Sequence, residues 1–282
     1  MKAGSVGSSP NGAANSSATS GSVQPLRDLL ASVGEAVANL NTAVVGLDAV
    51  EQGHNKPETL NISWNPNDRI AAARKSRRFV VEAVLVRVAE ALSEFVFVTA
   101  RLPRFSSVRN NWNSKTSRAE KLADVAAEAL GAKDYLTAGA VLLIHWRNRV
   151  VHPRSQASLT AAQEKNLRAS SEEIEKNFAG LSIERLLKDF ETGQPTLKDV
   201  SSLIAMSIRM ARAVDKAVSD LSDDDLGILL DYYGLKARIS EIEAQTTPSK
   251  RHASVIRMLQ SSAPGLVPAY SRLHARTTGD SN

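Results

Sequence analysis

Apolar side chains recur at intervals of three and four residues along most of this chain. Such spacing places them on one face of an α-helix. The first run begins near Pro25 and weakens toward Val50. The longest run extends from about residue 67 to 101, with its apolar face at Val81, Val84, Leu85, Val88, Leu92, Phe95 and Val96. No segment of any length alternates as a half-buried strand would. The pattern predicts an all-α fold.

Residues that typically begin helices precede several of these runs. Asn67 is the predicted N-cap of the longest helix, and Pro103 should end it. Capping patterns of a hydroxyl residue followed three positions later by an acid occur at Ser117 with Glu120, Thr196 with Asp199, and Ser222 with Asp225. Loops are expected at residues 53–66 and 104–116. Further helices are expected at residues 156–178, 181–192, 196–221, 224–230 and 249–260.

Three regions follow from this pattern. Residues 1–22 are rich in Gly, Ser and Ala, have little to bury, and are predicted to be disordered. Residues 23–190 are predicted to form a helical domain, and residues 191–282 a C-terminal helical extension. The segment Phe79–Leu102 is the most membrane-like, but its five charged residues favour a buried amphipathic helix.

The chain contains no cysteine, which excludes disulfides and thiolate metal sites. The N-terminus lacks the charged and apolar pattern of a signal peptide. We therefore expect a cytoplasmic protein that does not associate with a membrane. No phosphate-binding glycine loop is present, so no nucleotide cofactor is expected.

Positive charge is concentrated in two segments. The net charge is +5, yet residues 65–118 alone hold 11 Lys and Arg against 4 Asp and Glu. Residues 249–276 add five cations and no acid. This segregation indicates a surface that faces a polyanion, without distinguishing RNA from DNA or lipid.

The most informative segment follows the apolar run 140–144. Asp134 can cap this helix, which should finish near His152 because Pro153 disfavours helical geometry in the residue before it. Within residues 145–154 the sequence places His145, Arg147, Arg149, His152 and Arg154 together with no Asp or Glu. Such uncompensated cationic charge is typical of a site that holds a phosphodiester.

The segment 147–152 resembles the defining motif of HEPN-superfamily ribonucleases: an Arg, a polar residue that is often Asn, and a His a few residues later. The resemblance covers the motif and its helix, and extends loosely over about residues 67–180. It implies a HEPN-type helical bundle with an extra N-terminal helix and additional C-terminal helices. It also implies that Arg147 and His152 are the catalytic pair and Asn148 an accessory polar residue. A toxin or defence role, restrained by an inhibitory or regulatory protein partner, is implied as well.

The residues themselves suit metal-independent RNA cleavage. RNA carries its own nucleophile, the 2′-hydroxyl. His152 can accept or donate a proton near neutral pH, and Arg147 can hold charge on the phosphate. Asn148 can position a phosphate oxygen or orient the His152 ring. The expected products are a 2′,3′-cyclic phosphate and a 5′-hydroxyl end.

Five residues apart on a helix, Arg147 and His152 point roughly 140° apart around the axis. A phosphate could bridge them only across the helix end or in a groove shared with a second copy. A two-fold dimer that packs these helices together would bring the Arg147 and His152 side chains of both copies to one groove, as the resemblance implies. We therefore predict a homodimer.

Each candidate also has a plainer interpretation. His152 can simply end its helix, favoured there by the helix dipole. His145 lies on the same face as His152, but a metal site is disfavoured because no carboxylate or cysteine stands nearby in the sequence. For Trp146 a core or dimer-interface position is favoured over base stacking. Trp112 lies in a segment that interleaves basic and aromatic residues. Such a segment suits either contact with single-stranded RNA or a loop exposed to solvent.

The remaining RNA-binding candidates are all arginines and lysines. They are Arg149 and Arg154 beside the motif, and Arg74, Lys75, Arg77 and Arg78 on the longest helix. A solvated face is the alternative for the latter group. Two rival functions stay open: a non-catalytic helical module that binds nucleic acid or a protein, and a phosphate-binding subunit of a separate transferase.

Overall fold

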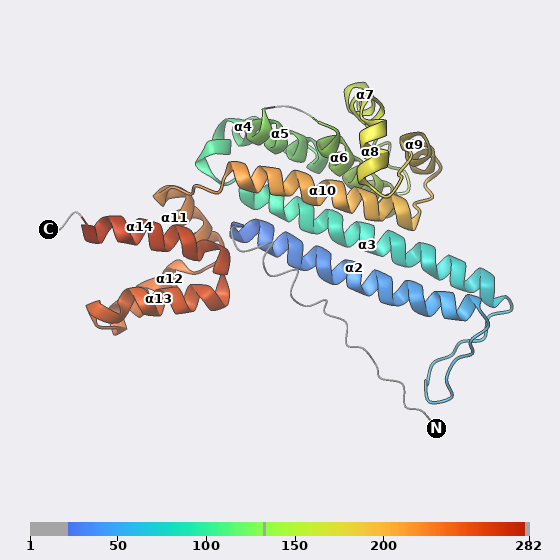
Figure 1. Ribbon diagram of the computed structural model, residues 1–282, viewed down its shortest axis with the longest axis horizontal. Helices are drawn as coiled ribbons and strands as arrows, with labels where there is room; N and C mark the ends of the chain where they lie inside the picture. Colours follow the sequence, from blue (N-terminus) through green and yellow to red (C-terminus); the bar gives the residue numbers. More distant parts are fainter. Residues whose placement is uncertain (1–21, 132–133, 280–282) are drawn as a thin grey trace. The chain divides into compact units, whose positions relative to one another are not determined.

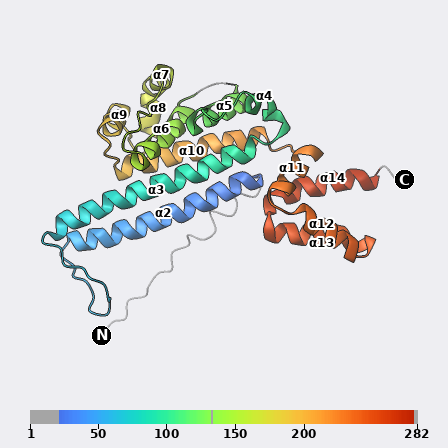
Figure 2. The same cartoon turned by 180° about the vertical axis from the view of Figure 1, so that it is seen from behind.

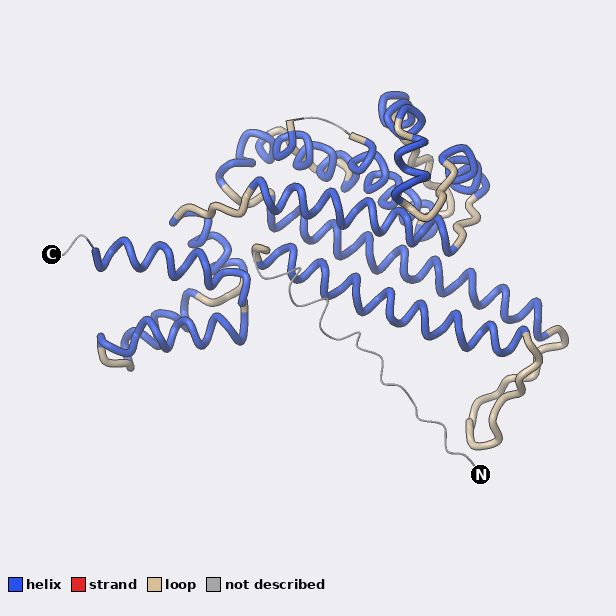
Figure 3. Tube along the Cα trace, viewed as in Figure 1, coloured by secondary structure: helices blue, strands red, loops and turns tan. Residues whose placement is uncertain are grey.

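The computed structural model describes residues 22–131 and 134–279 (Figure 1). Throughout these residues the backbone is helix or loop, without a strand, which confirms the all-α prediction (Figure 3). The predicted disordered tail lies outside the described residues except for Ser22. The helices are α2 (Gln24–Glu51), α3 (Arg69–Thr99), η1 (Pro103–Phe105), α4 (Ser106–Asn110), α5 (Arg118–Leu130), α6 (Tyr135–Val151), α7 (Ala161–Ala169), α8 (Ser171–Asn177), α9 (Ile183–Thr192), α10 (Leu197–Ala217), α11 (Asp223–Tyr232), α12 (Lys236–Gln245), α13 (Pro248–Ser262), η2 (Pro264–Leu266) and α14 (Val267–Gly279).

The chain divides into two compact units. The middle unit is Asp28–Ala217, and the terminal unit consists of the described residues of Met1–Arg27 and Val218–Asn282. This division differs from the boundary expected at residue 190. The reason is α10, whose apolar face is buried against α6, α5 and α3 of the middle unit.

Helix α6 is the centre of the middle unit. It packs against α10, α5, α3 and α7. Every residue from Thr137 to Ile144 is buried, and so is Trp146, two residues after Ile144. In Figures 1 and 2, α2, α3 and α10 run side by side in both views. The two ends of α6 approach the surface and its middle is enclosed, so the core holds the predicted motif helix in place.

Several predicted helix starts are confirmed. Ser117 and Glu120 form a complete capping box, and the Asp134 carboxylate accepts a hydrogen bond from the Thr137 N–H. The N-cap of α3 is Asp68, one residue after the predicted Asn67.

Other boundaries were predicted wrongly. The expected loop at 104–116 includes the short helices η1 and α4, and the expected helix at 156–178 is two helices, α7 and α8. Helices α12 and α14 were not predicted.

Among the described helices, α2 is the one long and apolar enough to cross a bilayer by length and composition. In the middle unit its Asp48 and Glu51 form ion pairs with Arg77 of α3. Its buried face there is Leu29, Val33, Ala36 and Leu40. The core helix of a soluble protein and a signal sequence can both have this length and composition.

Candidate functional site at the end of helix α6

The motif occupies the last turn of α6 and the residue that ends it. The His152 N–H donates to the Asn148 carbonyl at 2.9 Å, and His152 itself has extended backbone angles. The Ser155 N–H then donates to the His152 carbonyl at 2.8 Å. The predicted helix end before Pro153 is thus confirmed. The His152 side chain is exposed.

Arg147 is held by a carboxylate from another helix. Its Nη2 lies 2.5 Å from Glu90 Oε1 of α3, and its Nη1 donates to Asn148 Oδ1 at 3.2 Å. Arg118 of α5 binds the same Glu90 oxygen at 2.6 Å. The expectation that no carboxylate neutralises the cations of the motif was wrong, because the acid comes from a distant part of the sequence.

This cluster sits at the edge of the core. The Arg147 side chain is 14% exposed, and that of Glu90 is 40% exposed. Burial alone would raise the pKa of Glu90, but Arg118 and Arg147 together lower it below its ordinary value. Glu90 is therefore ionised at neutral pH. The Arg147 Nε is buried without a hydrogen-bond partner.

Arg149, a predicted RNA-binding residue, is engaged in packing. Its guanidinium lies 3.7 Å from the centre of the Phe190 ring. It donates at 2.9 Å to the Ala157 and Phe190 carbonyls. Burial lowers the pKa of Arg149, and the nearby Glu191 opposes that shift. This arginine ties the segment after α6 to the end of α9.

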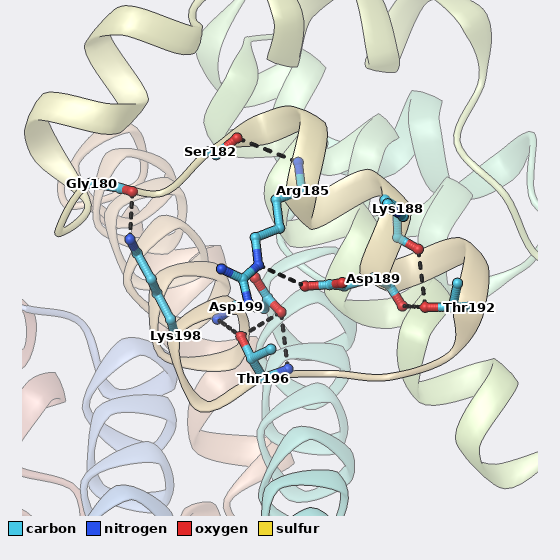
Figure 4. A network of polar contacts seen from close by, with 9 residues as sticks. All are labelled: Gly180, Ser182, Arg185, Lys188, Asp189, Thr192, Thr196, Lys198 and Asp199. Carbon is cyan, nitrogen blue, oxygen red and sulfur yellow. Dashed lines mark hydrogen bonds and ion pairs between the residues drawn. The ribbon is translucent and has the colours of Figure 1, made fainter.

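Polar contacts hold the end of α9, the turn after it and the start of α10 (Figure 4). Asp199 accepts hydrogen bonds from the Thr196 backbone and hydroxyl at 2.9 and 2.6 Å, as the capping pattern predicted. Arg185 and Asp189 form an ion pair one turn apart on α9. These contacts fix the end of α9 against which Arg149 packs.

Trp146 and His145 face inward. Trp146 is fully buried and packs edge-on against Phe190 at 5.5 Å, so the core interpretation holds and base stacking was the wrong alternative. His145 Nδ1 is buried without a hydrogen-bond partner. Burial and then the charge of Arg149 lower the pKa of His145 to about 4, against an opposing effect of Glu120. His145 is therefore neutral at physiological pH.

The other predicted RNA-binding residues differ in their surroundings. Arg154, Arg74 and Lys75 are exposed. Arg77 is paired with the two acids of α2, while Arg78 pairs with Glu82 at 2.8 Å and donates to the Gly193 carbonyl. The six cations therefore do not form one uniform phosphate-facing group.

Trp112 lies beside a pocket next to the Arg147 cluster. Its indole N–H donates to Asp124 at 3.1 Å, and Lys121 Nζ lies 5.4 Å from its ring centre. The pocket has a volume of about 290 Å³ and is lined by Glu90, Ser93, Glu94, Val96, Phe97, Trp112, Arg118 and Lys121. Sequence reasoning missed Glu90 and Arg118. The helical pattern of the sequence alone does not show which acidic side chain on the polar face of α3 contacts α6.

In the part of the chain that the structure describes, no group of three or more His, Cys, Asp or Glu side chains is arranged to hold a metal ion. In comparisons with known proteins, no family model, no curated protein and no solved structure matches this chain. The resemblance to HEPN ribonucleases rests on the motif and on its helix.

Proposed function

We propose that this protein is a metal-independent endoribonuclease whose site consists of Arg147, Asn148 and His152. The observation that carries the proposal is the placement of the motif. Arg147 is anchored by Glu90 and bonded to Asn148 in the last turns of a rigid core helix. His152 stands exposed just beyond that helix. A rigid support of this kind gives a reacting group a defined position.

In the proposed reaction the 2′-hydroxyl of RNA attacks the adjacent phosphorus and the bond to the 5′-oxygen breaks. The 2′-hydroxyl proton passes to a base, and the leaving 5′-oxygen takes up a proton. His152 serves one of these proton transfers, and Arg147 stabilises the charge on the phosphate in the transition state. The products are a 2′,3′-cyclic phosphate and a 5′-hydroxyl end.

Incubation of the purified full chain with mixed RNA in excess EDTA tests the proposal. Wild type should cut, and His152→Ala should lose at least about a hundredfold in rate, the typical contribution of acid–base catalysis. His54→Ala is the matched control, because His54 is an exposed histidine of the same unit that lies in a loop. Cleavage no faster in wild type than in His152→Ala would remove the proposal.

A homodimer is part of the proposal. Because α6 is surrounded by other helices of its own unit, a second copy can reach the motif only at the end of α6. Light scattering coupled to size exclusion should give twice the chain mass. A monomer that cleaves RNA would overturn the shared-groove arrangement.

The rival function is a non-catalytic helical module that binds nucleic acid or a protein. The Arg147–Glu90 pair and the packing of Arg149 favour it, because both arginines have structural partners. Arg147→Ala distinguishes the two. Loss of cleavage with RNA affinity retained supports the ribonuclease, and loss of affinity alone supports the binding module. A toxin or defence role, a regulatory partner and a cytoplasmic location remain part of the proposal through the resemblance.

A further inference from the structure

A groove lies between α2 and α3, which run side by side in the middle unit (Figures 1 and 2). Its volume is about 470 Å³, and the proposed reaction uses none of the residues that line it. Ala36, Leu40 and Val84 are buried lining residues, whereas Phe79 in the same groove is 70% exposed. The groove is therefore apolar inside and open to solvent.

Helix α2 is apolar along its length but is poorly covered by its own unit. Only 22% of its most apolar 18-residue stretch is buried, and Val45 is 71% exposed. Uncharged and mostly small residues occupy its other outward positions, which lets a second helix approach closely. They are Ala31, Gly34, Ala38, Asn39, Asn41, Thr42 and Gly46. The α2 side of the groove is thus a surface that a partner can cover.

The two sides of the groove carry opposite charge. Residues 28–51 hold four acids and no Lys or Arg, whereas residues 69–87 hold six Lys and Arg and one acid. In the groove itself, the exposed Glu35 lies on the α2 side and the exposed Arg87 on the α3 side. A partner must therefore bring a basic edge to α2 and an acidic edge to α3. The α2–α3 pair of a second copy has both.

We propose that two copies of this chain form a dimer by packing their α2–α3 grooves against each other. A two-fold axis parallel to the helices places α2 of each copy on α3 of the other. Because Glu35 and Arg87 line the same groove, Glu35 of one copy then faces Arg87 of the second copy, and the reverse. Phe79 packs over the small residues of the second copy's α2.

The size of this face suits a stable dimer. At about 1.5 Å per residue and about 10 Å per helix, the middle-unit part of α2 and the α3 beside it present about 700 Å². Stable protein interfaces bury about 800 Å² per partner.

The interface goes beyond the proposed function, because it forms whether or not the chain cuts RNA. Its relation to the candidate site rests on the proposed function. Arg87 lies one turn before Glu90, which holds Arg147 at 2.5 Å. A second copy on the groove therefore extends toward the end of α6.

Sedimentation velocity of the full chain over a dilution series tests the interface. Glu35→Arg and Arg87→Glu should each weaken the dimer by about tenfold, because two symmetric attractions become repulsions. An equimolar mixture of the two variants should dimerise like wild type, since each then brings the charge that the other needs. Arg74→Glu is the matched control: it makes the same charge change on the same helix, outside the groove.

The apolar part of the interface has its own pair of variants. Phe79→Ala should weaken the dimer by roughly tenfold, the effect of one buried aromatic anchor. Leu197→Ala removes an exposed apolar side chain of α10 that does not line the groove, and it should leave the dimer unchanged.

A wild-type chain that stays monomeric throughout the series would overturn the inference. So would equal weakening by Arg74→Glu and Arg87→Glu, or a mixture of the two variants that associates no better than either alone. Binding of monomeric wild type, but not Phe79→Ala, to phosphatidylcholine vesicles would assign the face to a membrane instead. A dimer that cuts no RNA in EDTA would remove the proposed function and leave the interface, whereas a monomer that cuts RNA would do the opposite.

Discussion

At the scale of single residues, Glu90 joins two arginines from different helices. Its Oε1 binds both Arg147 of α6 and Arg118 of α5, and its Oε2 binds Arg118 as well. Arg147 is mostly buried, so its charge depends on this partner more than an exposed arginine would. Glu90 therefore acts as a positioning residue for the candidate site.

Replacing Glu90 with Gln should show this dependence. We expect a loss of about 1–2 kcal/mol in the free energy of unfolding, because Arg147 keeps its charge at low exposure without an anion. RNA cleavage should fall as well if Arg147 acts on the phosphate. Urea unfolding and the EDTA-resistant cleavage assay measure the two effects.

The control for Glu90→Gln is Glu82→Gln on the same helix. Glu82 pairs with the exposed Arg78 one turn away, a contact worth below about 0.5 kcal/mol. Equal losses in the two variants would contradict a special role for Glu90.

His145 should make folding sensitive to pH. Its pKa is about 4 in the folded protein, against an ordinary value of 6.5. Between these values the unfolded chain binds more protons, so stability rises with pH. Above pH 6.5 the buried ring costs no stability on this account, and as the pH falls toward 4 stability falls by on the order of 3 kcal/mol.

Thermal unfolding of wild type and His145→Gln between pH 4 and 7 measures this contribution. The variant should lose stability less steeply on acidification. His54→Gln, a change in an exposed loop, should follow wild type. Parallel curves for wild type and His145→Gln would show that burial of this ring does not control the slope.

At the scale of helices, α6 and α10 approach closely at Gly139. A Cβ at this position would overlap the Met206 side chain, whose own Cβ would lie 3.2 Å away. Met206 is fully buried, so it has little room to move. Gly139→Ala should therefore destabilise the middle unit by about 1–2 kcal/mol despite the better helix propensity of alanine.

Gly34→Ala in α2 is the matched change, since a Cβ there meets nothing within 4 Å. It should stabilise the protein by up to about 1 kcal/mol. Combining Gly139→Ala with Met206→Ala should cost less than the two single changes added together. Strict additivity would mean that the two residues do not compete for space.

The elements also show what a sequence pattern can predict. The roles of Ser117 and Asp134 as N-caps, and of Pro153 in ending α6, were predicted correctly. Each of these residues affects only backbone within a few positions along the chain. The partnership of Glu90 with Arg147 depends on how α3 meets α6, and no local pattern contains that information. The amphipathic pattern of α10 was recognised, but its assignment to the middle unit required the packed structure.

At the scale of the whole molecule, residues from both ends of the chain form one compact unit. Helix α2 begins in the terminal unit and continues in the middle unit. Within the terminal unit, the buried Gly265 N–H donates to the Gln24 side chain at 2.9 Å. A Cβ on Gly265 would lie 2.8 Å from the Gln24 Cα, a backbone atom that cannot rotate away.

Gly265→Ala should therefore loosen the terminal unit selectively. We expect a loss of about 2–3 kcal/mol, because overpacking against backbone forces the two segments apart. Hydrogen exchange should speed up at amides of η2 and α13 and stay unchanged in α6, the centre of the other unit. Gly227→Ala in α11 is the control, because it adds a methyl group in open space within the same unit. Any effect of Gly227→Ala on hydrogen exchange should be a slowing, since alanine favours the helix more than glycine does. If Gly265→Ala sped exchange equally in α6 and α13, the two units would unfold as one, and the contact between the chain ends would support the candidate site as well as its own unit.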